Sequence, residues 1–259
     1  MIGTFIRAVR EGSEPVFWAG VLHLAWLPVL LVLTLVDERM ILGLNPWIKP
    51  MKFILSTVIF LATAGFLIQE LGHPPGSSLI GWVIAISMVV ENTLINLQSF
   101  RGVRSHFNSD SPWNAAIFLL MGIFIVASSG AMLGLLIASF RAPMFLTAGY
   151  LWGIRLGIAI FLIGSAQAGF MLRVSAHTMG APDGGAGLPF LNWSTKYGDL
   201  RIGHFFGLHA IQILPLIGWL ADRWASHNPA LIVTVASIFY LGMVVLFTLQ
   251  ALSGKPLFF

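Results

Sequence analysis

Two ionisable side chains interrupt long apolar stretches of the sequence. Glu91 lies near the middle of the stretch Leu79–Phe100, and Arg155 has a similar place in Met144–Leu172. A charge at the centre of a membrane costs ~2.5–3.5 kcal/mol on insertion scales, so each of these candidate catalytic residues needs a partner or a purpose. We expect them to lie at nearly the same depth and to form an ion pair. The pair would either hold two helices in register or supply a counter-ion or proton-relay carboxylate to a cavity.

Other polar side chains accompany Glu91 along the same stretch. Ser87, Glu91 and Gln98 fall on one helical stripe, and Asn92 and Asn96 form a second stripe beside it. A half-face of polar groups on a helix in lipid must face the protein interior. Interhelical hydrogen bonds contribute only about 0.6–2 kcal/mol each. These polar side chains could therefore have a purely structural role and hold neighbouring helices together. We favour a solvated or ligand-lined cavity over hydrogen bonds that only hold the helices together.

Four of the seven histidines fall on one side of the predicted membrane: His106, His177, His204 and His209. Neutral imidazole is the commonest metal ligand, and histidine also ligates haem iron. We expect these four to bind a transition metal, or His106, His204 and His209 to bind a haem b. In either case Gln98 and Gln212 would be hydrogen-bond partners of the ligands. The alternative is that interfacial histidines cap helix ends and bind lipid headgroups.

A glycine-rich loop lies between the fifth and sixth apolar stretches, at about residues 173–203. It lacks the spacing of a P-loop and the strand–helix context of a dinucleotide site, so we expect no nucleotide there. Its one candidate catalytic carboxylate is Asp183, which could join the histidines as a ligand or help to activate a metal-bound water. The loop could fold over the mouth of a bundle as a lid.

The composition describes the elements that must position these residues. The chain has 259 residues, of which 57% are hydrophobic and only 9% are charged, with a mean hydropathy of +0.88. Soluble domains carry about 25% charged residues, so the soluble class is excluded. The absence of cysteine excludes disulfides, thiolate zinc sites, iron–sulfur clusters and a cysteine nucleophile. Positive charges stand singly, without a basic run, so we expect no nucleic-acid partner.

Seven apolar stretches are long enough to cross a membrane, for which about 20 residues suffice. They are Pro15–Val36, Met51–Gln69, Leu79–Phe100, Ala115–Phe140, Met144–Leu172, His204–Leu220 and Pro229–Leu252. Continuous runs of this length are unlike the alternating segments of a transmembrane barrel. The sequence therefore predicts an all-α, polytopic bundle of seven transmembrane helices that forms a single domain over residues 1–259.

The loops indicate how the bundle is oriented. Nine Lys and Arg residues fall on one side of the predicted membrane and four on the other, with Arg155 inside a span. The positive-inside rule then places the C-terminus in the cytoplasm and the N-terminus outside. The longer loops lie on the cytoplasmic side, which we therefore expect to be the working side. We expect the protein in a bacterial cytoplasmic membrane.

Small residues predict where helices approach closely. Gly149, Gly153 and Gly157 recur at four-residue spacing and should form one packing stripe. Arg155 should point away from this stripe, since it lies about 200° round the helix from Gly153. A second seam is expected at Gly130 and Gly134.

Three stretches carry a resemblance. They are Gln98-Ser-Phe-Arg-Gly with Ser105-His-Phe-Asn, Asp183-Gly-Gly-Ala-Gly-Leu-Pro, and Gly198-Asp-Leu-Arg-Ile-Gly-His-Phe-Phe-Gly-Leu-His with Gln212 and Leu214-Pro215. Over roughly the C-terminal two thirds, the chain resembles a family of bacterial polytopic membrane proteins without an established activity. The chain departs from the seven-helix zinc hydrolases of the ceramidase and progestin-receptor-like group, because its last span contains no histidine.

Three functions follow from these patterns. The first is electron transfer or oxidoreductase chemistry at a haem or transition metal near the cytoplasmic face. The second is a small-solute or proton-coupled transporter that uses a cavity containing Glu91 and Arg155. The third is a non-catalytic membrane subunit or sensor. The expected partner is the lipid bilayer. A small-molecule partner, a redox partner and a homo-oligomer are further alternatives.

Overall fold

The computed structural model describes residues 2–141, 145–225 and 227–257. Within these residues, seven helical spans are long and apolar enough to cross a membrane: Glu14–Val36, Ile48–Glu70, Ser77–Phe100, Pro112–Ser139, Ala148–Val174, Leu200–Trp224 and Pro229–Leu252. They match the seven predicted stretches, although the predicted start of the fifth, Met144, lies outside the described residues. The all-α fold is confirmed, and the chain is a multi-pass membrane protein.

The chain divides into two compact units, Met1–Leu135 and Leu136–Phe259. The boundary falls within helix α5 (Pro112–Ser139), so most of α5 belongs to the first unit and its last turn to the second. We describe each unit by itself, and the expected single domain stays a prediction.

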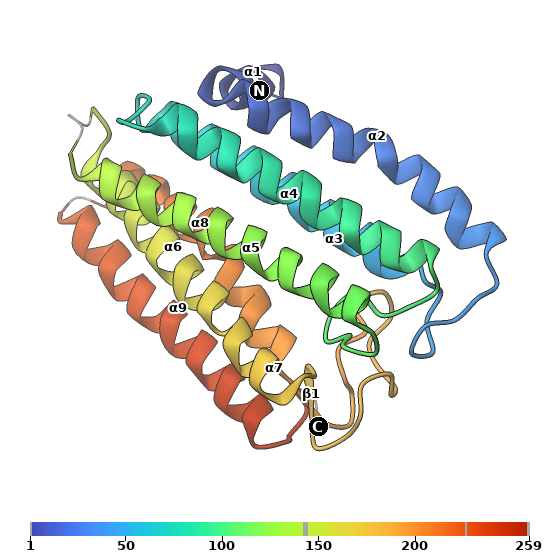
Figure 1. Ribbon diagram of the computed structural model, residues 1–259. Helices are drawn as coiled ribbons and strands as arrows, with labels where there is room; N and C mark the ends of the chain where they lie inside the picture. The colour runs from blue at the N-terminus through green and yellow to red at the C-terminus, as the bar shows by residue number, and fades with distance from the viewer. Residues whose placement is uncertain (1, 142–144, 226, 258–259) are drawn as a thin grey trace. The chain divides into compact units, whose positions relative to one another are not determined.

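The first unit contains α1 (Ile2–Gly12), α2 (Glu14–Val36), α3 (Ile48–Glu70), α4 (Ser77–Phe100) and most of α5. Helix α3 is central, because it packs against α1, α2 and α4 (Figure 1). At one end of α3 the buried side chains Leu30, Trp47 and Ile54 form a core cluster. A second cluster of Ile95, Ile117 and Met121 joins α4 to α5.

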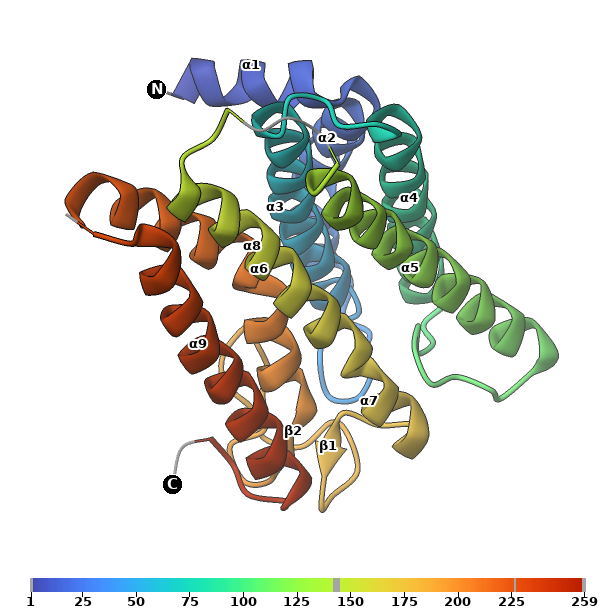
Figure 2. The same cartoon turned by 90° about the vertical axis from the view of Figure 1, so that its left-hand side faces the viewer.

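Helix α1 is an element that the sequence analysis does not predict. It runs across the ends of α2 and α3 rather than along them (Figure 2). Glycines permit the close approach, since a Cβ on Gly12 would collide with the carbonyl oxygen of Gly65, and a Cβ on Gly81 would collide with the hydroxyl of Ser13. The backbone of α1 is therefore fixed directly against α3.

The second unit contains α6 (Ala148–Ala166), α7 (Ala168–Val174), α8 (Leu200–Trp224) and α9 (Pro229–Leu252). The fifth span is thus interrupted at Gln167, where α6 ends and α7 begins. A two-stranded antiparallel ladder joins β1 (Thr178–Met179) to β2 (Gly198–Asp199). Helix α8 starts four residues before its predicted start, because the Asp199 side chain caps it by accepting a hydrogen bond from the Arg201 backbone N–H.

The predicted glycine stripe is the interface between α6 and α8. A Cβ on Gly153 would lie 2.5 Å from the carbonyl oxygen of Leu214, and one on Gly157 would lie 2.9 Å from that of Ala210. The stripe is confirmed. The seam expected at Gly130 and Gly134 is largely wrong: a Cβ on Gly130 would meet no described atom within 4 Å, and one on Gly134 would meet only the Ile80 side chain, at 3.6 Å.

Candidate functional site

The Glu91 carboxylate is the buried acidic group of the first unit. Glu91 is 6% exposed within α4. Its Oε1 lies 3.7 Å from Nε2 of His106, while its Oε2 accepts no hydrogen bond from any described residue. A buried acceptor without a donor costs free energy and calls for an explanation. The open oxygen marks this carboxylate as a place where a proton, a water or a solute donor could bind.

His106 reaches Glu91 from the loop that follows α4. The chain turns sharply there, with positive φ at Gly102 (73°) and at Phe107 (52°). The other ring nitrogen of His106, Nδ1, lies 3.3 Å from the Lys49 ammonium and 3.0 Å from the Ser105 hydroxyl. An ammonium only donates, so Nδ1 is the acceptor of the neutral ring and the Nε2 proton points towards Glu91.

Aromatic rings surround this pair. The His106 ring centroid lies 5.5 Å from that of Phe53 on α3, 6.3 Å from that of Phe107 and 6.0 Å from that of Phe118 on α5. Phe118 also belongs to the apolar cluster between α4 and α5. These rings pack around the imidazole, whose side chain remains 24% exposed, whereas the Glu91 side chain is 8% exposed.

The predicted polar stripe on α4 is buried, and its members have partners on three elements. Asn92 donates to the Thr57 hydroxyl on α3 over 3.0 Å, but its Oδ1 accepts no hydrogen bond from the described residues. Asn96 accepts from the Trp26 indole of α2 over 3.1 Å. Glu91 and Asn92 therefore present two open acceptor atoms at adjacent positions of one helix.

Gln98 lies at the loop end of α4, where it is fully buried. Its amide donates to Asn114 of α5 over 3.3 Å and accepts from the Arg101 guanidinium over 2.5 Å. Arg101 also donates to Asn114, over 2.8 Å. This layer anchors the start of the loop that carries His106. The role of Gln98 beside a cofactor stays a prediction.

A second polar layer fixes the neighbouring loop between α2 and α3. Asp37 accepts three charged hydrogen bonds from the Arg39 guanidinium and one from the Trp47 indole, the last over 2.8 Å. The Arg39 guanidinium also donates to the Phe100 carbonyl at the end of α4. Arg39, followed by Trp47, holds the pKa of Asp37 well below its usual range. The loop that leads to Lys49 is thereby tied to the end of α4.

Arg155 lies in the second unit and has its own partners there. Its guanidinium donates to the Ser139 carbonyl over 2.7 Å, and it lies over the rings of Phe140 and Trp152 at 4.1 and 5.4 Å. It points away from the glycine stripe, as predicted. The ion pair with Glu91 would join the two units and stays a prediction.

His177, His204 and His209, the three predicted ligands in the second unit, each have a partner for Nδ1. His204 donates to the Gly164 carbonyl over 2.7 Å, and His209 donates to the Gln212 amide oxygen over 3.2 Å. His177 lies 3.0 Å from the Asp183 carboxylate. The predicted contact between His209 and Gln212 is therefore present.

The structure does not gather these histidines into one ligand set. His106 belongs to the first unit, and the other three belong to the second. Among the described residues, no group of three or more His, Asp or Glu side chains is close enough together to hold a metal ion. A haem needs only one or two axial ligands. The metal and haem sites both stay predictions.

Asp183 and Asp199 organise the glycine-rich loop. Asp183 accepts a hydrogen bond from the Thr178 backbone N–H over 2.9 Å, and the buried Asp199 accepts from the Ser194 backbone N–H over 2.8 Å and from the Arg201 guanidinium. A shallow depression of about 300 Å³ lies on the loop, lined by residues that include His177, Asn192 and Arg201. Whether the loop acts as a lid stays a prediction.

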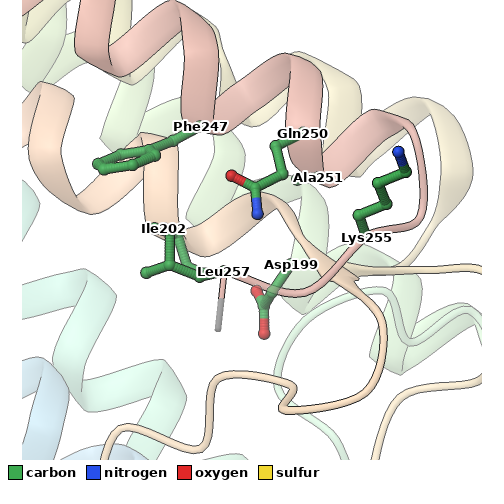
Figure 3. Close-up of a pocket in the computed structure, with 7 residues that line it drawn as sticks. All are labelled: Asp199, Ile202, Phe247, Gln250, Ala251, Lys255 and Leu257. Atoms are coloured by element: carbon green, nitrogen blue, oxygen red, sulfur yellow. The ribbon is translucent and has the colours of Figure 1, made fainter. Parts of the chain in front are cut away.

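A second depression lies where α8, α9 and the segment after α9 meet (Figure 3). It encloses about 150 Å³ beside Asp199, Ile202 and Gln250. In the close-up, the ammonium of Lys255 points away from the Asp199 carboxylate. This volume includes open solvent, and the depression that the described residues form has no internal space for a water-sized molecule, so it offers no room for a cofactor.

Three residues of the first site were not predicted: Lys49, Ser105 and Asn114. Ser105 adjoins the predicted ligand His106, and Asn114 directly precedes the predicted fourth span. These sequence positions could have indicated that both residues belong to the site. Lys49, in the first turn of α3, contacts His106 across 57 residues of sequence, and nothing in the local pattern indicates that contact.

No family model matches the chain, and neither a curated protein nor a solved structure matches it.

Proposed function

We propose that the protein is a proton-coupled transporter of a small solute in a bacterial cytoplasmic membrane, with Glu91 and His106 as its proton-carrying pair. The observation that supports this function is the buried Glu91 carboxylate with one oxygen open and the other 3.7 Å from an imidazole. Ionisable residues inside a membrane commonly mark proton relays and solute pathways. Histidine is suited to pass protons because its charge changes near neutral pH.

The contacts indicate a direction for the proton through the imidazole. Nδ1 of His106 takes up a proton on the side of Lys49 and Ser105, and Nε2 gives up its own proton to Glu91. The carboxylate becomes neutral, and the imidazole returns to its neutral form with the other tautomer. A neutral Glu91 offers a hydrogen-bond donor where the charged form has only acceptors. Protonation therefore changes which solute group can bind beside Asn92.

The experiment measures proton movement into proteoliposomes that contain a trapped pH-sensitive dye. Panels of amino acids, organic acids, sugars and organic cations are added to the wild type and to Glu91→Gln. We expect one solute class to acidify the wild-type vesicles and to leave the Glu91→Gln vesicles unchanged. Glu38→Gln is the matched control, since it makes the same chemical change at an exposed loop position. If acidification is equal in the wild type and Glu91→Gln for every panel, the proposal is wrong.

Haem binding is a second candidate, and it is favoured by one contact. The His204 Nδ1–H donates to the Gly164 carbonyl over 2.7 Å, which leaves Nε2 as the ring nitrogen with the lone pair, as in histidines that ligate metals. The absorption spectrum of the detergent-purified protein tests it. A Soret band that disappears in His204→Ala and persists in His73→Ala would support haem. A colourless protein after expression with excess haem would exclude this candidate.

A further inference from the structure

Helix α1 has one apolar face and one polar face. Ile2, Phe5, Ile6 and Val9 recur at the spacing of a single helical face, and both acidic and basic side chains lie on the opposite side. Thr4 is one of the residues opposite Ile6, because two residues correspond to about 200° of rotation. The pattern is amphipathic over the whole helix.

The first unit covers only part of the apolar face. Val9 is 6% exposed, and the Phe5 ring packs on Phe66 of α3 with centroids 5.3 Å apart. Ile2 and Ile6 point the same way, but they remain 79% and 49% exposed. The apolar face therefore extends beyond the protein surface that it packs against. The side chains of Ile2 and Ile6 must be buried against another apolar surface.

The position of α1 identifies that surface. Helix α2, the first span, begins at Glu14, only two residues after α1 ends at Gly12. Helix α1 therefore lies at the level where the first span leaves the hydrocarbon. Trp18, at the start of α2, is 54% exposed, and the Arg10 guanidinium lies 5.8 Å from its ring centroid. Exposed tryptophan and arginine side chains are typical of the interface between acyl chains and headgroups.

We propose that α1 is an interfacial membrane helix that binds the bilayer surface. Ile2 and Ile6 insert among the acyl chains, while Arg7 on the polar face contacts lipid phosphates. Because Gly12 packs against Gly65, α1 cannot swing away from α3 as a flexible arm would. This lipid-binding surface goes beyond the proposed transport function and does not depend on it.

The test uses the absence of cysteine from the natural sequence, so that a single introduced cysteine can be labelled alone. Ile6→Cys and Thr4→Cys are each labelled with a nitroxide in the full-length protein and placed in phosphatidylethanolamine–phosphatidylglycerol vesicles. Relaxation by oxygen, which concentrates in lipid, is compared with relaxation by a water-soluble nickel chelate. We expect oxygen to dominate at position 6 and the nickel chelate to dominate at position 4.

Two outcomes would overturn the proposal. If the nickel chelate relaxes the label at position 6 as strongly as the label at position 4, α1 is exposed to water. If neither reagent reaches position 6, another protein surface covers the helix instead of lipid. Circular dichroism of both variants first establishes that the labelled proteins retain their helices.

Discussion

Two acceptor atoms of α4, Oε2 of Glu91 and Oδ1 of Asn92, are buried without a donor from the described residues. The presence of Glu91, Asn92 and Gln98 in an apolar stretch allowed a buried polar face to be predicted. The partner of Glu91 could not be predicted, because His106 reaches it through a turn with left-handed backbone at Gly102 and Phe107. Such loop conformations leave little periodic signal in a sequence.

The Nδ1 contacts of His106 lead to a prediction about proton delivery. In His106→Phe, Glu91 keeps its aromatic surroundings but loses the imidazole that we propose passes protons to it. We expect solute-driven proton uptake to fall about 100-fold or more, in the 10²–10⁴-fold range typical of a lost proton-transfer group. The dye assay in proteoliposomes measures it, with His73→Phe as the control in an exposed loop. Unchanged uptake in His106→Phe would show that protons reach Glu91 by another route.

Asp37 gives a prediction for the pH dependence of stability. Arg39 lowers the pKa of Asp37 in the folded protein relative to an unfolded value of about 3.9. The stabilisation is therefore complete above about pH 4 and disappears as the pH falls through the folded-state pKa. We expect Asp37→Asn to lower the melting temperature at pH 7. The difference in melting temperature between the wild type and Asp37→Asn should shrink below about pH 4. Thermal unfolding in detergent across this range measures the difference, and a difference independent of pH would contradict the assignment. Glu38→Gln should show no difference from the wild type.

Helices differ in how much their sequence reveals. The seven spans were predictable from length and hydropathy alone, and the stripe of Gly149, Gly153 and Gly157 was predictable from spacing. Helix α1 was missed because 11 residues are too few to span a membrane, although the spacing of Ile2, Phe5, Ile6 and Val9 is a helical signal. Gly130 was wrongly assigned to a seam, because spacing cannot tell whether a neighbouring helix is present.

The contact between α6 and α8 predicts the effect of a single methyl group. Gly153→Ala would place a Cβ 2.5 Å from the Leu214 carbonyl oxygen and 2.9 Å from the Cα of Pro215, both backbone atoms. We expect a loss of about 1–3 kcal/mol in the free energy of unfolding, as for other overpacked interiors. Gly242→Ala in α9 is the matched control, since a Cβ there meets nothing within 4 Å. Denaturant titration in mixed micelles measures both, and equal stability of the two variants would contradict the prediction.

The described part of the molecule has seven apolar spans, and its predicted orientation in the membrane rests on the distribution of charged loop residues. Two exposed serines of the first unit report opposite sides of the membrane: Ser78, at the start of α4, and Ser109, in the loop after it. The positive-inside rule places Ser109 in the cytoplasm. The fold was thus predictable at this scale, but the arrangement of the two units was not, because no periodicity specifies it.

Orientation can be tested with matched serine-to-cysteine variants. We expect a membrane-impermeant maleimide to label Ser78→Cys in intact cells, and to label Ser109→Cys only after the cells are permeabilised. The natural chain contains no cysteine that could react in the background. The reverse pattern would place the loop with His106 outside the cell and would mean that its protons come from the external medium.

The rigid junction between α1 and α3 has a consequence for hydrophobic mismatch. Helix α3 has 23 residues and is about 35 Å long, somewhat more than the ~30 Å hydrocarbon core of a typical bilayer. If α1 rests on one leaflet, the vertical position of α3 is fixed from that side. Any change in bilayer thickness must then be absorbed by tilt or at the opposite end, where Lys49 and His106 meet. Membrane thickness would thus set how far the contact between Lys49 and His106 stands from water.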